Sequence, residues 1–238
     1  MEYLPNEVND IIKNYTIFKP KTNKKLKKAV NLWCKNKDAA LNKYGHISLW
    51  DTSLITDMVN LFVDKEDFNE NINNWDVSNV TTMFGLFYNA KSFNQPLNNW
   101  DVSNVKDMNA VFVGAISFNQ PLNNWNVSNV TDMRAMFANA KSFNQPIDNW
   151  DVSNVIDMDS MFYYSLNFNQ PLNNWNISNV ETMEEMFCTA ESFNQSLNNW
   201  NIEPKHKNRM YSIFLDASSF DEKNALWYDF SKFPKNII

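Results

Sequence analysis

The apolar residues of this chain recur with a period of 25 residues from Trp50 to Trp200. Within one unit, Trp100 and Val102 alternate with polar residues, which is the period of a short strand. Ser103 then stands as a candidate helix N-cap. Apolar residues follow at steps of three and four, which predicts a helical stripe made of Val105, Met108, Val111, Phe112 and Ala115. Each unit is therefore predicted to be a strand, a short helix and a return loop.

Columns of identical residues define the repeat. The string Phe-Asn-Gln-Pro-Leu-Asn-Asn-Trp begins at Phe93, Phe118 and Phe168. A 25-residue unit has no interior of its own, so units must stack to bury their apolar side chains. We therefore expect an α/β solenoid resembling a leucine-rich-repeat array, with about seven strand–helix repeats and a parallel strand ladder. One position holds tryptophan in seven consecutive units: Trp50, Trp75, Trp100, Trp125, Trp150, Trp175 and Trp200.

An array of stacked units needs a cap at each end. We expect a helical N-terminal cap at residues 1–45, the solenoid at 46–215 and a C-terminal cap at 216–238. The pattern from Asn23 to Lys43 predicts one amphipathic helix, whose solvated side holds Lys24, Lys25, Lys27 and Lys28. Its apolar side holds Leu26, Ala29, Val30, Trp33, Ala40 and Leu41. An aromatic plug follows the array, made of Phe220, Leu226, Trp227, Phe230 and Phe233.

Charge and cysteine content bear on the kind of partner and on the cellular compartment of this protein. The formal net charge of -6 argues against a nucleic-acid partner, because phosphate binding needs a basic surface. The two cysteines, Cys34 and Cys188, are too few for a disulfide framework in a chain of this size and favour a reducing compartment. The first residues show no signal-peptide pattern, and no run of about 18 apolar residues predicts a membrane span. We therefore expect a cytoplasmic protein.

The repeat resembles the BspA-like leucine-rich-repeat family. Its best copies are residues 125–133 followed by Met136-Phe137, and residues 150–158 followed by Met161-Phe162. The family consists mostly of surface proteins of bacteria and protists, many of them adhesins, together with proteins of large DNA viruses. The resemblance therefore implies a non-enzymatic binding protein. Because the chain shows no signal peptide, lipidation cysteine or wall anchor, an intracellular member is favoured, in the host cytoplasm or the virion if the source is viral.

Residues 4–15 resemble the opening of an F-box. That resemblance implies an adaptor that recruits ubiquitin-ligase machinery. The alternative is an amphipathic N-terminal helix that packs on the cap through Leu4, Val8, Ile11, Ile12 and Tyr15.

Two sets of residues are candidate partner contacts. The carboxylates of Asp51, Asp76, Asp101 and Asp151 should line the concave strand face, either as a solvated, self-paired polar surface or as a surface that binds a partner. A metal site is not expected there, because calcium needs six to eight oxygens and like charges recur at separate levels. Aromatic side chains that anchor interfaces are the second set: Phe84, Tyr88, Tyr163 and Tyr164.

Two further columns are predicted to be structural. Five of the tryptophans, Trp75, Trp100, Trp125, Trp150 and Trp175, should pack in the core. The asparagines that precede glutamine should turn inward and bond to loop backbone: Asn94, Asn119, Asn144 and Asn169.

Chemistry-bearing motifs are scarce. His46 and His206 are the only histidines, neither has a partner at metal-ligand spacing, and the chain has no glycine-rich phosphate loop. We therefore predict no catalytic, metal-binding or cofactor-binding residues. The predicted function is a non-enzymatic module that binds a protein partner or acts as a scaffold. A surface adhesin, a structural protein of a particle and an F-box-type adaptor are the alternatives.

Overall fold

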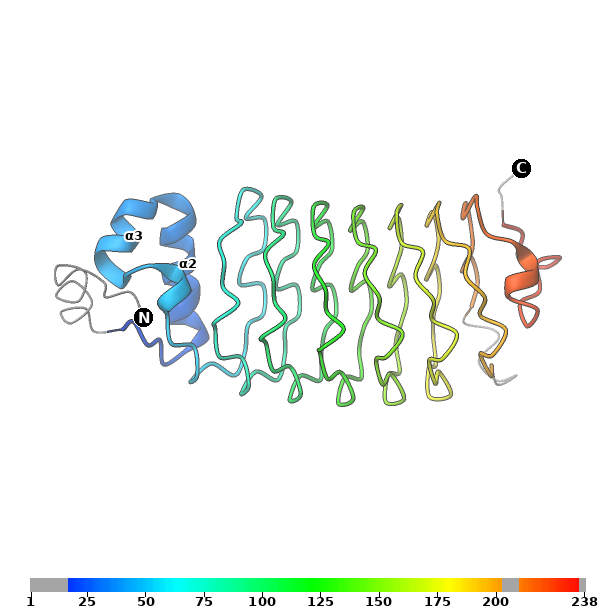
Figure 1. Ribbon diagram of the computed structural model, residues 1–238, viewed down its shortest axis with the longest axis horizontal. Coiled ribbons are helices and arrows are strands. Elements are labelled where there is room, and N and C mark those ends of the chain that lie inside the picture. The colour runs from blue at the N-terminus through cyan, green and yellow to red at the C-terminus, as the bar shows by residue number, and fades with distance from the viewer. Residues whose placement is uncertain (1–16, 203–209, 236–238) are drawn as a thin grey trace, which may run out of the picture.

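The computed structural model describes residues 17–202 and 210–235. A helical cap lies at one end, a row of stacked coils follows, and a short C-terminal segment lies at the other end (Figure 1). The helical segments of the described residues are α2 (Asn23–Lys35), α3 (Lys37–Tyr44), η1 (Ile47–Leu49) and η3 (Glu222–Asn224). The F-box-like stretch at residues 4–15 and His206 lie outside the described residues.

The N-terminal cap is two helices where the sequence predicted one. The backbone leaves the helical conformation at Asn36, whose side chain accepts a hydrogen bond of 3.0 Å from the Ala39 amide and so caps α3. The buried residues of α2 are Leu26, Ala29, Val30 and Trp33, as predicted. Leu41 was predicted to be on the apolar side and is instead 41% exposed, because α3 begins at a new angle.

Neighbouring coils are joined through the backbone. In one coil every second amide, from Met83 to Asn89, donates to a carbonyl of the next coil at 2.7–2.9 Å. The amides between them close turns, as when Tyr88 donates to the Gly85 carbonyl. The coils that follow repeat this pattern at 108–114, 133–139 and 158–164. Backbone polar groups are thus satisfied between coils rather than within a helix.

The predicted α/β fold with strand–helix repeats and a parallel strand ladder is therefore wrong. Between residues 50 and 202 the structure contains neither a helix nor an extended strand. Ala110 and Gly114 have positive φ angles of 59° and 67°, which an α-helix cannot contain, although both lie within the segment from Val105 to Ala115 that was predicted to be helical. In place of the strand ladder, single parallel β-bridges join one residue of each coil to the next: Asp57, Thr82, Asp107, Asp132, Asp157 and Thr182 in succession.

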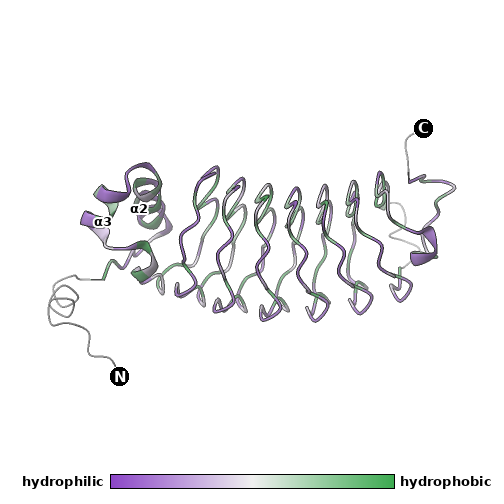
Figure 2. Cartoon of the chain, turned by 45° about the horizontal axis from the view of Figure 1, so that its top comes forward, coloured by the Kyte–Doolittle hydropathy of each residue, from purple (hydrophilic) through white to green (hydrophobic). Residues whose placement is uncertain are grey.

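Aromatic rings from successive coils form columns in the core. The rings of Phe87 and Phe112 stack with centroids 5.5 Å apart, and those of Trp100 and Trp125 with centroids 6.4 Å apart. The Trp125 indole also donates a 3.0 Å hydrogen bond to the Leu97 carbonyl of the previous coil. Each coil therefore depends on its neighbours for burial, and apolar segments alternate with polar ones along each coil (Figure 2).

The C-terminal segment covers the last coil. Phe220 is buried, and Trp227, Phe230 and Phe233 are partly buried against the core. Leu226 was predicted to belong to this plug and is instead 76% exposed. Burial in this segment raises the pKa of the Tyr228 hydroxyl to about 12.

Candidate functional site

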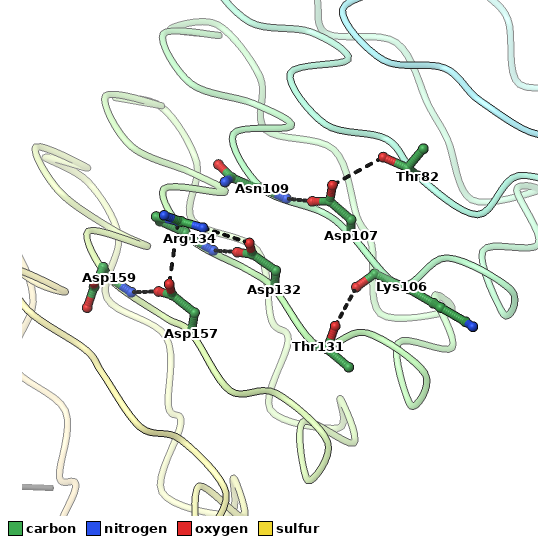
Figure 3. Close-up of polar contacts among 9 residues, drawn as sticks. All are labelled: Thr82, Lys106, Asp107, Asn109, Thr131, Asp132, Arg134, Asp157 and Asp159. Atoms are coloured by element: carbon green, nitrogen blue, oxygen red, sulfur yellow. Dashed lines mark hydrogen bonds and ion pairs between the residues drawn. The ribbon is translucent and has the colours of Figure 1, made fainter.

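The column of bridge residues marks a continuous polar surface, which we call the ladder face and define as residues 79–84, 104–109, 129–134, 154–159 and 179–184. Three of its aspartates accept the backbone amide two residues further on at 2.9 Å: Asp107 from Asn109, Asp132 from Arg134 and Asp157 from Asp159. Figure 3 shows these bonds side by side on successive coils. The carboxylates therefore hold the turns that follow the bridges.

One cation lies between two of these carboxylates. Arg134 Nη2 is 2.9 Å from Asp132 and its Nε is 3.5 Å from Asp157 (Figure 3). Burial raises the pKa of Asp157, and the negative charges of Asp159 and Asp132 raise it further. The hydrogen bond from the Asp159 backbone amide and the positive charge of Arg134 oppose this shift without cancelling it. The Asp157 anion is thus disfavoured in the fold. Among the described residues, no three acidic, histidine or cysteine side chains are grouped so that they could hold a metal ion.

A shallow open groove of about 540 Å³ lies on the ladder face. On one wall, the Asn129 and Asn154 amides each donate a 2.7 Å hydrogen bond to a serine carbonyl of the previous coil. On the other wall, the Thr131 hydroxyl donates to the Lys106 carbonyl (Figure 3). Both walls are therefore held by bonds between coils. The lining residues are Lys106, Asn129, Thr131, Asn154, Ile156, Asn179 and Glu181.

In the predicted aspartate column, Asp76, Asp101 and Asp151 are exposed and Asp51 is partly exposed, but the carboxylates serve local turns. Asp101 and Asp151 accept the amides of Ser103 and Ser153, and Asp51 and Asp76 accept both the amide and the hydroxyl of the serine two residues on. Ser103 is therefore not a helix N-cap, and the strand face on which the aspartates were placed does not exist. Hydrogen bonds from Lys19 and Ser53 lower the pKa of Asp51 to about 2, and bonds from the serines lower those of Asp101 and Asp151.

The predicted aromatic contacts lie in two places. Phe84 and Tyr88 belong to one coil, whereas Tyr163 and Tyr164 lie three coils further along the stack. The rings of Tyr163 and Tyr164 are 6.2 Å apart, and the Lys141 ammonium is 5.2 Å from the Tyr164 ring. The side chains are only partly exposed, at 37% to 38%. They form two small clusters, and neither lines the groove.

Both columns that were predicted to be structural, the tryptophans and the asparagines, make contacts from one coil to the next. The five tryptophans are buried. The Asn144 side-chain oxygen accepts from the Asn169 backbone amide and the Gln170 side chain, both at 2.9 Å, so the loop backbone that it bonds is that of the next coil. Asn94, Asn119 and Asn169 make the same pair of bonds.

The sequence predictions did not single out the groove residues. Their signal was present as an asparagine in the recurring string Trp-x-Val-Ser-Asn, with Ile in place of Val in the last copy, at Asn79, Asn104, Asn129, Asn154 and Asn179.

A second hollow of about 410 Å³ lies between α2 and the first coil, next to Trp33, Cys34, Lys65 and Glu70. Burial raises the pKa of the Cys34 thiol, and the same cause raises that of Cys188. Both thiols are therefore protonated at neutral pH, which makes them poor nucleophiles.

The stacked coils, the core of aromatic columns and the polar ladder face define a repeat protein built from 25-residue coils. The chain belongs to the family described as "Mycoplasma protein of unknown function, DUF285", which it matches over residues 29–146 and 117–227. This family supports the BspA-like resemblance as far as a repeat family, and does not extend it to the F-box. No curated protein and no solved structure matches the chain. In the described part of the chain, every helix is too short or too polar to cross a bilayer.

Proposed function

We propose that this protein is a non-enzymatic repeat module and that the groove on the ladder face binds a segment of a protein partner. The observation that carries the proposal is Ile156, which is 45% exposed in a groove whose other lining residues are polar. The equivalent positions of the neighbouring coils hold Thr131 and Glu181. An apolar centre with a polar rim is the arrangement of protein interfaces.

The chemistry of the groove defines the partner segment. Walls of asparagine and threonine side chains, already bonded to the backbone, give a surface that does not have to reorganise on binding. The segment should place an apolar side chain over Ile156 and an acidic side chain towards Lys106. The groove runs across several coils, so an extended segment fits it better than a helix does.

The test is quantitative affinity capture from the native source, with mass spectrometry as the readout. A specific partner should be captured by the native protein and lost with Ile156→Glu, which puts a charge at the apolar centre of the groove. Two matched variants alter the other candidate surfaces: Tyr163→Ala with Tyr164→Ala, and Asp101→Asn with Asp151→Asn. Both should retain the partner. Loss with either of these, together with retention by Ile156→Glu, would contradict the assignment of the groove.

We further propose that the protein acts inside cells, since both cysteines are free thiols. Fractionation of the native source tests this, with the protein expected in the soluble cell interior or bound to internal membranes. Recovery only outside cells, or only on particles, would favour an adhesin or a structural protein of a particle.

A further inference from the structure

Charge is distributed unevenly along the molecule. Residues 17–45 contain nine lysines and a single acidic residue, Asp38, which is a net charge of +8. Residues 46–238 contain 11 basic and 23 acidic residues, which is a net charge of -12. The basic part is the helical cap at one end, and the acidic coils extend away from it (Figure 1). The total of -6 hides this separation.

The lysines of α2 are gathered on one face. Its buried residues include Leu26, Val30 and Trp33, which pack on the core. At 100° per residue, Lys24, Lys28 and Lys35 fall on the opposite side of the helix, and Lys25 lies beside them. Lys21 immediately precedes the helix. We call these five exposed lysines the basic face: Lys21, Lys24, Lys25, Lys28 and Lys35.

The basic face works against the stability of its own helix. The first turn of α2 contains no acidic residue but holds lysines, which the positive end of the helix dipole repels. Lys24 and Lys28 are also one turn apart, where like charges repel each other. Lys19 and Lys37, at the edges of the cap, pair with Asp51 and Glu70. None of the five lysines of the basic face forms an ion pair with a carboxylate of the described residues.

We propose that the basic face docks on the surface of an anionic lipid bilayer. Five lysines on one exposed face provide the attraction to lipid phosphates and carboxylates. The apolar side of α2 is buried in the cap, so the helix does not insert and the binding is peripheral and reversible. The acid-rich coils extend away from the cap, which limits their repulsion from the same surface (Figure 1).

The chemistry of the cap favours a membrane over a nucleic acid. Residues 17–45 contain no arginine, whose planar fork reads bases and grips phosphates in pairs. The cap aromatics pack against one another and not on the basic face: Phe18 is 4.5 Å from Tyr44 and Trp33 is 6.0 Å from Trp50, measured between ring centroids. No aromatic of this segment is therefore placed to stack on a base.

The test is co-sedimentation of the full chain with vesicles of phosphatidylserine and phosphatidylcholine, against vesicles of phosphatidylcholine alone. The basic-face variant replaces Lys21, Lys24, Lys25 and Lys28 by Gln. The matched control replaces Lys91, Lys141, Lys223 and Lys232 by Gln, which removes the same charge from the rest of the chain. We expect binding to the anionic vesicles only, at least about tenfold weaker for the basic-face variant, intact for the control, and lost at high salt.

Both variants should fold, because all eight lysines are exposed or partly exposed, and circular dichroism checks this. Binding that is equally weak in both variants, or equal on neutral vesicles, would overturn the proposal. Tighter binding to a DNA duplex through the same lysines would assign the face to nucleic acid instead. Self-association that the basic-face variant loses, without any vesicle binding, would assign it to a second copy of the chain. The outcome does not depend on Ile156, so it is distinguishable from the test of the groove.

Discussion

At the scale of single residues, asparagine oxygens link one coil to the next. Each asparagine of the column that includes Asn144 accepts two hydrogen bonds from the following coil, one of them from a backbone amide. The Asn169 amide lies outside the segment 158–164, whose amides donate to carbonyls of the next coil, so it depends on the asparagine oxygen as its acceptor. These side chains therefore add to the backbone hydrogen bonds that join the coils.

Asn144→Ala should lower the free energy of unfolding by about 1–3 kcal/mol, because it leaves the Asn169 amide without its acceptor. Asn174→Ala, at an exposed position, is the matched control and should change stability by less than about 0.5 kcal/mol. Chemical denaturation measures both. Melting temperatures that are equal for Asn144→Ala and the native protein would remove the structural role of this column.

Glycine is needed at one coil contact for two separate reasons. Gly114 has a φ of +67°, and a Cβ added there would lie 2.4 Å from the Asn89 side-chain oxygen of the previous coil. Gly45 has a φ of +70°, and nothing lies within 4 Å of an added Cβ. A substitution of Gly45 by alanine therefore measures the cost of the left-handed backbone alone, without a steric clash.

Gly45→Ala should therefore destabilise by about 1–2 kcal/mol, the cost of a left-handed backbone for a residue with a Cβ. Gly114→Ala should cost about 1–3 kcal/mol more, because Asn89 must also move. Denaturant midpoints of the two variants measure the difference. An equal loss of stability in both variants would show that Asn89 moves away from the added Cβ without an energetic cost.

At the scale of the element, the turns of the coils hold carboxylates whose negative charge is disfavoured at some positions and stabilised at others. Burial raises the pKa of Asp157, so this carboxyl stabilises the fold only at low pH, and its contribution is lost as the pH rises through the raised value. Hydrogen bonds from Ser103 lower the pKa of Asp101, so that carboxylate stabilises the fold above its unfolded pKa of about 3.9, and its contribution is lost as the pH falls through the lowered value.

Substitution by asparagine should therefore have opposite effects at the two positions. At neutral pH, Asp157→Asn should raise the melting temperature and Asp101→Asn should lower it slightly, since Asn126 makes the same turn with a neutral amide. The Asp157→Asn difference should shrink as the pH falls through the raised pKa of Asp157 towards about 3.9, whereas the Asp101→Asn difference should shrink as the pH falls from about 3.9 through the lowered pKa of Asp101. Thermal melts of the three proteins at several pH values are the measurement. If both substitutions raised the melting temperature at neutral pH, or both lowered it, the causes assigned to the pKa shifts of Asp157 and Asp101 would be contradicted.

At the scale of the whole molecule, each coil contacts only its neighbours, as the hydrogen bonds between consecutive coils and the stacked rings show. Stability is then close to a sum of units and of the contacts between them. A whole unit can therefore be removed while the two new neighbours still match, and the caps at the two ends keep their own contacts.

Deletion of residues 119–143 joins Phe118 to Asn144 and restores the Phe-Asn-Gln-Pro string. This variant should fold and unfold cooperatively, with a lower melting temperature than the native protein because one set of contacts between coils is lost. Deletion of residues 119–131, about half a coil, should give an unfolded or aggregated protein, because the inward and outward positions no longer align. Circular dichroism and thermal melting compare the two, and failure of the 25-residue deletion to fold would contradict stacking of equivalent coils.

The sequence by itself determined the period, the buried positions and the need for caps. A recurring Trp, Met and Phe can satisfy the hydrophobic effect only by facing a common interior, whatever the backbone between them does. The sequence also showed the carboxylate and asparagine columns, whose spacing is that of the repeat.

Only the tertiary structure decided the backbone conformation and the candidate sites. Apolar residues at steps of three and four face inward from a helix and equally from a series of turns, so the pattern from Val105 to Ala115 is compatible with both. The turns prevail because every second amide finds its acceptor one coil away, a partner that no local pattern reveals. For the same reason the groove around Ile156 forms only when four coils are stacked, and the basic face of α2 only when its apolar side is buried.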